Sequence, residues 1–164
     1  MPIKTVEDLF IQELSDAYSA EKQMTKSLPK MARAASDPEL AQAFEQHLEE
    51  TRAQVERIDQ VVELTGFKLK RTKCVGMEGL IEEGLGLVEK IDKGLVLDAA
   101  LIGSAQKVEH YEIASYNTLV TLAIKLDLID AVSLLKESLQ EEQATDEKLS
   151  TLAEAIAIEE AVEG

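Results

Sequence analysis

The chain has 164 residues, of which 45% are apolar and 4% aromatic, and its formal net charge is −15. This length suffices for one sizeable core, and the scarcity of Gly, Pro and β-branched runs favours helix over strand. The negative charge excludes binding to nucleic acid through its phosphates, because no basic patch or arm is present to release counterions. We therefore expect one all-α domain over residues 1–164, with cations as partners.

The segment at the start of the chain, MPIKTVEDLF, lacks the apolar stretch of a signal peptide, and no later segment is apolar enough to span a membrane. The single cysteine, Cys74, excludes an internal disulfide. These features predict a cytoplasmic protein without a membrane partner.

The first predicted helix begins after Thr5, since Thr5 with Asp8 three residues later resembles a capping box, and it extends to about Ala35. Pro29 lies inside this helix and predicts a kink or a short break over residues 27–29.

The second predicted helix covers residues 38–65. Asp37 is suited to cap it, and Pro38 fits the first helical position. Gly66 is suited to the left-handed residue that follows a helix C-terminus.

A long crossover with a weak helical pattern follows, from Gly66 to Gly94, with a short helix predicted over residues 77–90. Two more long helices are predicted over residues 96–126 and 131–160, the latter capped by Asp130. A short connection, a long crossover and a second short connection give the order of a ferritin-like four-helix bundle. The up-down-up-down alternative would require a short middle connection.

Carboxylates fall inside the apolar stripe of each long predicted helix. Glu21, for example, stands seven residues after Leu14 and seven before Leu28, so it faces the same side as these leucines. Burying a carboxylate is costly unless a proton or a cation neutralises it. The pattern therefore predicts a metal site formed by Glu21, Glu50, Glu109, Glu112, Glu142 and Asp146. The alternative is that these acids lie at the margins between helices, in water or paired with Lys and Arg.

Carboxylate oxygens are the ligands preferred by Fe(II) and Mn(II), and we expect two iron or manganese ions bridged by Glu50 and Glu142. Di-iron bundles usually supply Glu-x-x-His from two helices. Here Gln54 and Asp146 are predicted to take the places of those histidines, which makes the site rich in oxygen.

The two histidines are interpreted separately. His47 lies one turn before Glu50, so it binds the metal directly, forms a hydrogen bond to a ligand, or is a histidine at the edge of the core that is bonded to a carboxylate. His110 points about 100° away from Glu109 around the helix, which predicts a packing or interface residue.

Three segments, DAYSAEKQ at 16–23, HLEET at 47–51 and QKVEHYEIA at 106–114, resemble the YciE/YciF family of bacterial stress proteins. The resemblance covers essentially the whole chain. It implies a ferritin-like bundle related to rubrerythrin, a homodimer and a di-metal centre. Glu109-x-x-Glu112 followed by Glu142 is similar to half of a rubrerythrin site.

Two functions follow from these observations. The first is oxidative-stress protection by a di-metal centre that oxidises iron or removes peroxide. The alternative is a metal-free helical stress protein that acts through dimerisation or partner binding.

Overall fold

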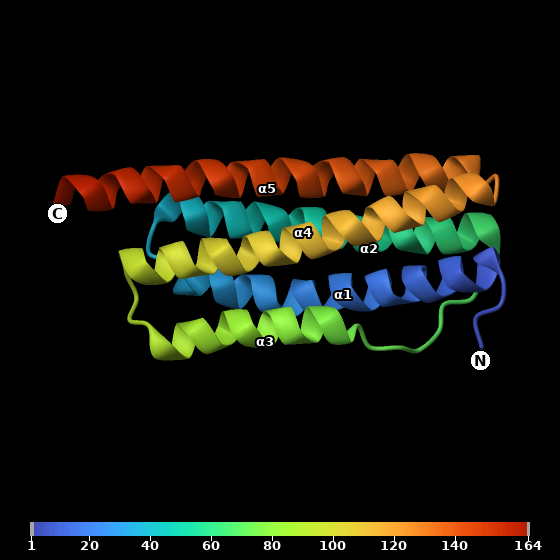
Figure 1. Ribbon diagram of the computed structural model, residues 1–164, viewed down its shortest axis with the longest axis horizontal. Coiled ribbons are helices and arrows are strands. Elements are labelled where there is room, and N and C mark those ends of the chain that lie inside the picture. The colour runs from blue at the N-terminus through green and yellow to red at the C-terminus, as the bar shows by residue number, and fades with distance from the viewer. Residues whose placement is uncertain (1, 164) are drawn as a thin grey trace.

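The computed structural model describes residues 2–163, with the side chains of residues 2–157. The described residues form five helices and no strand (Figure 1), which confirms the all-α prediction. The helices are α1 (Val6–Ala34), α2 (Pro38–Thr65), α3 (Val75–Lys90), α4 (Leu95–Lys125) and α5 (Ile129–Glu163).

The residues predicted to cap the first two helices form the expected contacts. The Thr5 hydroxyl accepts a hydrogen bond from the Asp8 amide, and the Asp8 carboxylate accepts one from the Thr5 amide. Asp37 caps α2 through the amide of Glu39. Gly66 ends α2 with a φ of 70°, a left-handed conformation that glycine adopts without steric cost.

Two details of the prediction are wrong. First, of the predicted kink or short break at Pro29, the break is absent, because α1 continues through this residue. Leu28 and Met31, on either side of the proline, are buried in the core. Their packing holds the helix in register although the proline provides no amide donor.

Second, Asp130 does not cap the last helix, because α5 begins at Ile129 and Asp130 lies in its first turn. The turn before α5 is closed by backbone hydrogen bonds, from Asp127 to Ile124 and from Leu128 to Ala123, and Asp127 has a φ of 57°. At its actual position the Asp130 carboxylate still lies near the positive end of the helix dipole.

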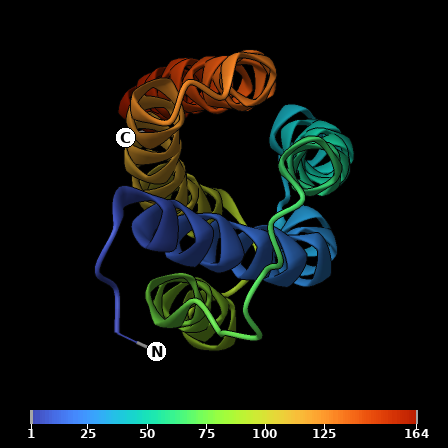
Figure 2. The same ribbon diagram turned by 90° about the vertical axis from the view of Figure 1, so that its right-hand side faces the viewer.

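The four long helices contact one another in a closed order. α1 packs against α2 and α4, and α5 packs against the same two helices. α3 lies outside this group and packs on α1 and α4, as the nearly end-on view shows (Figure 2).

The core is divided into two apolar clusters. The first apolar cluster lies near the α1–α2 turn and includes Met24, Phe44, Leu101 and Leu152. The second apolar cluster lies at the opposite end and includes Phe10, Ile58, Leu119 and Leu135. Between them is a buried polar layer, formed by Glu21, His47, Thr51, Gln54, Glu109, Glu112, Ser138 and Glu142.

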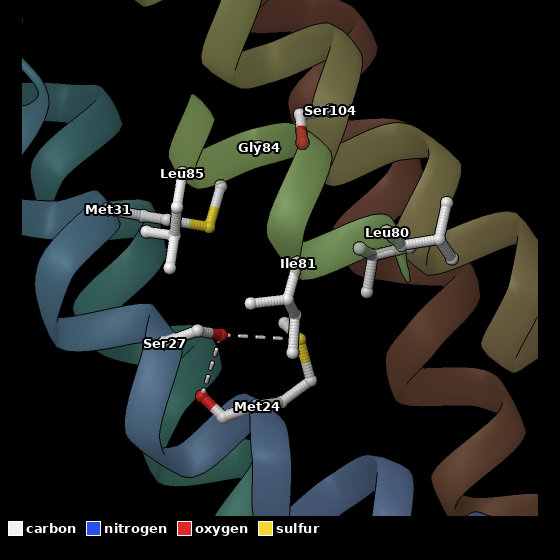
Figure 3. Close-up of a pocket in the computed structure, with 9 residues that line it drawn as sticks. Met24, Ser27, Met31, Leu80, Ile81, Gly84, Leu85 and Ser104 are labelled. Carbon is white, nitrogen blue, oxygen red and sulfur yellow. Dashed lines mark hydrogen bonds between the residues drawn. The ribbon is translucent and has the colours of Figure 1, made fainter. Parts of the chain in front are cut away.

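α3 approaches its neighbours closely because it carries glycine on its inner face. Ile81 lies over Met24 of α1, and Gly84 faces Ser104 of α4 (Figure 3). The remaining pocket at this junction measures about 10 Å³, which is room for about one water molecule. Nearer the start of α3, Gly76 faces the ring of Tyr111, whose hydroxyl contacts the Cys74 sulfur at 3.2 Å.

Gly76→Ala is expected to lower the free energy of unfolding by about 1–3 kcal/mol, the usual cost of overpacking a close contact. The new Cβ would lie 2.6–2.8 Å from three atoms of Tyr111, so the ring must shift and release Cys74. Gly79→Ala, in the same helix with no atom within 4 Å of its Cβ, is the matched control. Its melting temperature should rise slightly, since alanine favours helix over glycine. Equal melting temperatures for the two variants would contradict this account.

Candidate metal site

Four side chains of the polar layer converge on one point. His47 from α2, Glu109 and Glu112 from α4, and Glu142 from α5 each place one nitrogen or oxygen within 4.8 Å of the others. All four residues are buried. We call this group the His47–Glu cluster. One imidazole and three carboxylates are a ligand set that suits iron, manganese or zinc.

The polar atoms of the His47–Glu cluster lack partners within the described part of the chain. Both carboxylate oxygens of Glu109, Glu112 and Glu142 are buried without a hydrogen bond. His47 Nε2 lies 2.7 Å from Glu109 Oε1, but the two atoms are not aligned as a hydrogen bond. Two ligand atoms bound at right angles to one ion at about 2.1 Å would be about 3 Å apart. Since buried polar groups are nearly always satisfied, the cluster fits a cation.

Glu21 of α1 lies beside the cluster. Its Oε1 accepts a hydrogen bond of 3.0 Å from the Tyr116 hydroxyl, and its Oε2 is buried and unpaired among the described residues. Burial and repulsion from Glu142 raise the pKa of Glu21 well above its ordinary value. Glu21 therefore adds a fourth buried carboxylate next to those of the cluster.

Burial also sets the protonation of the cluster itself. It raises the pKa of Glu112 and Glu142 well above the ordinary value, and the charges of neighbouring glutamates add to this shift. For His47, burial lowers the pKa, but the neighbouring carboxylates, Glu109 foremost, together outweigh burial, so the net pKa is well raised. Without an ion, the layer thus retains protons that a bound cation would displace.

Glu50 lies at the edge of the site. Its side chain is 26% exposed and accepts hydrogen bonds from Gln46 and Thr145. The neighbouring His47 imidazole lowers the pKa of Glu50. Its Oε2 lies 3.7 Å from His47 Nδ1, so Glu50 touches the cluster from outside without belonging to it.

Gln54 and Asp146 are also outside the His47–Glu cluster. Gln54 is buried and donates a hydrogen bond of 3.3 Å to Glu141. Asp146 is 21% exposed and lies 3.3 Å from His110. His110 is 68% exposed, and it lies on α4 away from the cluster. The structure therefore brings together Glu109, Glu112 and Glu142 of the predicted set, with Glu21 beside them.

His47 is the member of the cluster whose role the sequence left open between direct metal binding and a hydrogen bond to a carboxylate. The signal that identifies its position is the buried stripe of α2, in which Ala43, His47, Thr51 and Gln54 follow one another at steps of three or four. Glu50 is turned about 60° back from His47 at 100° per residue, which places it at the margin of that stripe.

The fold and the buried cluster define an all-helical protein with a candidate metal site between its helices. A family model described as "Domain of unknown function (DUF892)" matches residues 5–162, and the chain belongs to this family. It is 62% identical over 154 residues to Protein YciF of Escherichia coli strain K12, covering 93% of each chain. The predicted resemblance to the YciE/YciF family is thereby confirmed.

Solved structures agree with this assignment. The crystal structure of the E. coli stress protein YciF superposes with a TM-score of 0.92 at 60% identity, covering 94% of this chain and 98% of that one. YcfI of Rhodopseudomonas palustris gives 0.88 at 46% identity, with coverage of 91% and 95%. A protein of Xanthomonas campestris gives 0.76 at 28% identity, with coverage of 94% and 95%.

Among the described residues, no helix combines the length and apolar content needed to cross a membrane.

Proposed function

We propose that this protein is a ferritin-like di-metal carboxylate protein that protects the cell by oxidising Fe(II) or removing peroxide. The observation that supports it best is the His47–Glu cluster, whose carboxylate oxygens are buried and unpaired within the described residues. The order of α1, α2, α4 and α5, with α3 in the long connection, corresponds to a ferritin-like bundle with one crossover.

In this proposal the His47–Glu cluster holds the ions, and Glu21 and Glu50 complete the shell. The buried carboxylates of Glu21, Glu109, Glu112 and Glu142 offer up to four negative charges, which equals the positive charge of two divalent ions. Gln54 and Asp146, which lie outside the His47–Glu cluster, are not assigned as ligands in this proposal. Bound iron or manganese would supply the redox chemistry.

The residues around the site perform the remaining tasks. Tyr116 holds Glu21 in position by donating a hydrogen bond from its hydroxyl, and Glu50 Oε2 faces His47 Nδ1 at 3.7 Å. The two apolar clusters cover the polar layer from both ends of the helices and exclude water there. Homodimerisation and a cytoplasmic location stay predictions that accompany this function.

The first test measures metal content. Protein stripped with EDTA, incubated with Mn(II) or with anaerobic Fe(II) and then desalted, is expected to retain close to two ions per chain by elemental analysis. Fe(II)-loaded protein mixed with peroxide or oxygen should then lose Fe(II), measured with a colorimetric chelator, faster than Fe(II) in buffer.

Retention of ions without accelerated oxidation would contradict the redox function and leave metal binding alone. Retention of no ion would overturn the proposal and favour the metal-free stress protein that acts through dimerisation or partner binding.

A further inference from the structure

The contact between α2 and α5 is polar along the middle of both helices. Antiparallel helices bring residues together whose numbers have a nearly constant sum, and the pairs in this contact follow that rule. We call them the α2–α5 seam: Gln46 with Lys148 at 3.2 Å, Glu50 with Thr145 at 3.2 Å, Gln54 with Glu141 at 3.3 Å, and Arg57 with Ser138 at 3.2 Å.

A cavity of about 100 Å³ lies in this seam beside the metal site. Its lining includes Gln46, Glu50, Thr145 and Lys148 on the outer side and His47 on the inner side. This volume is several times the 10–15 Å³ that one water molecule requires. The cavity therefore has room for a hydrated ion next to a residue of the buried cluster.

The residues of the cavity connect solvent to the cluster in three steps. Glu50 is partly exposed, and its Oε2 lies 3.7 Å from His47 Nδ1. His47 in turn presents Nε2 to Glu109 Oε1 at 2.7 Å. His47 thus has one nitrogen toward the cavity and the other toward the cluster, and it separates the two.

The outer opening is covered by a hydrogen-bonded chain. Lys148 donates to the side-chain oxygen of Gln46, and Gln46 donates to Glu50 at 3.3 Å. The Lys148 ammonium repels cations at the opening, whereas the Glu50 carboxylate attracts them. Both Gln46 and Lys148 are exposed side chains that can move without disturbing the core.

We propose that the α2–α5 cavity is the route by which divalent cations reach the buried cluster, with Glu50 as the first carboxylate they meet and the Gln46–Lys148 bridge as the gate. This inference rests on the proposed metal-binding function. It predicts that changes at the cavity alter the rate of metal uptake and leave the final amount of bound metal unchanged.

The test uses Co(II) as the probe, mixed by stopped flow with EDTA-stripped protein and followed by its visible absorbance. Ala144 lines the cavity from an exposed position on α5, so Ala144→Trp obstructs the route without replacing a ligand. We expect uptake at least about tenfold slower with the same final amplitude. Gln143→Trp, an exposed neighbour that does not line the cavity, is the matched control and should leave the rate unchanged.

A second variant opens the gate. Lys148→Met removes the ammonium and its bond to Gln46 but keeps most of the side-chain length, and it should accelerate uptake severalfold. Lys136→Met, another exposed lysine of α5 outside the cavity, serves as control. Circular dichroism checks that all four variants retain their helices.

The two proposals fail in different ways. If wild-type protein gives no Co(II) signal, the metal-binding function fails and the route fails with it. If the final amplitude is normal but the rates of Ala144→Trp and Lys148→Met equal that of the wild type, the route alone is overturned and ions reach the cluster elsewhere.

Discussion

Glu142→Gln is expected to lower the affinity for Mn(II) by more than about a hundredfold, because Glu142 belongs to the buried cluster and both of its oxygens are unpaired among the described residues. Changes in groups that merely orient ligands cost about 10–100-fold, so loss of a ligand should cost more. The neutral amide also removes repulsion with Glu109 and Glu112, so the metal-free variant should be more stable than metal-free wild type.

Calorimetric titration with Mn(II) and urea denaturation in EDTA measure the two effects. Glu147→Gln, an exposed position on the same helix, is the matched control and should change neither the affinity nor the stability. Unchanged affinity in Glu142→Gln would remove Glu142 from the site. Loss of metal-free stability in this variant would show that the carboxylates do not repel one another.

Metal-free wild type is expected to lose stability as the pH rises above about 4.5. The folded-state pKa values of Glu21, Glu112 and Glu142 are raised well above 4.5, so the folded state retains protons that the unfolded state has released. Stability is therefore greatest below the unfolded value and falls as the pH rises toward the folded values. His47, raised above 6.5, contributes in the same direction at higher pH.

Each unit by which a pKa is raised corresponds to about 1.4 kcal/mol once the pH exceeds the folded value. The lowered pKa of Glu50 acts in the opposite direction, but its effect is complete near pH 5. We expect the melting temperature in EDTA to fall by more than about 5 °C between pH 5 and pH 8, since 1 kcal/mol corresponds to about 2–4 °C at this chain length.

Saturating Mn(II) should reverse this trend, because cations bind the deprotonated carboxylates. Thermal denaturation at pH 5, 6.5 and 8, with EDTA or with Mn(II), measures both slopes. Glu142→Gln in EDTA should show a shallower slope than wild type. A metal-free melting temperature that stays level or rises over this range would contradict the assigned environment of the acids.

The parts of the fold that local chemistry determines could be predicted from the sequence. Thr5 with Asp8, Asp37 with Pro38, and Gly66 each act through atoms a few residues away, so their effect does not depend on the rest of the chain. Pro29 is different, because buried neighbours hold the helix together there and sequence cannot weigh that packing against the missing donor.

At the candidate site too, the sequence pattern predicts burial only where packing between helices does not decide it. Periodicity correctly predicted that Glu21, Glu109, Glu112 and Glu142 are buried, since each lies near the centre of its apolar stripe. Glu50 and Asp146 fit the same spacing but lie at the margins of their helices. A small rotation of a helix about its own axis decides whether such an acid is buried or lies at the margin. The packing of the neighbouring helices sets that rotation.

The division of the core into two apolar clusters has a consequence for cooperativity. Each long helix is anchored in one dry core near its first half and in another near its second half, and the halves meet at a layer of mutually repelling acids. We therefore expect the two ends of the metal-free molecule to open independently on either side of this layer. Ligands drawn from α2, α4 and α5 to a common ion would join the two halves into a single unfolding unit.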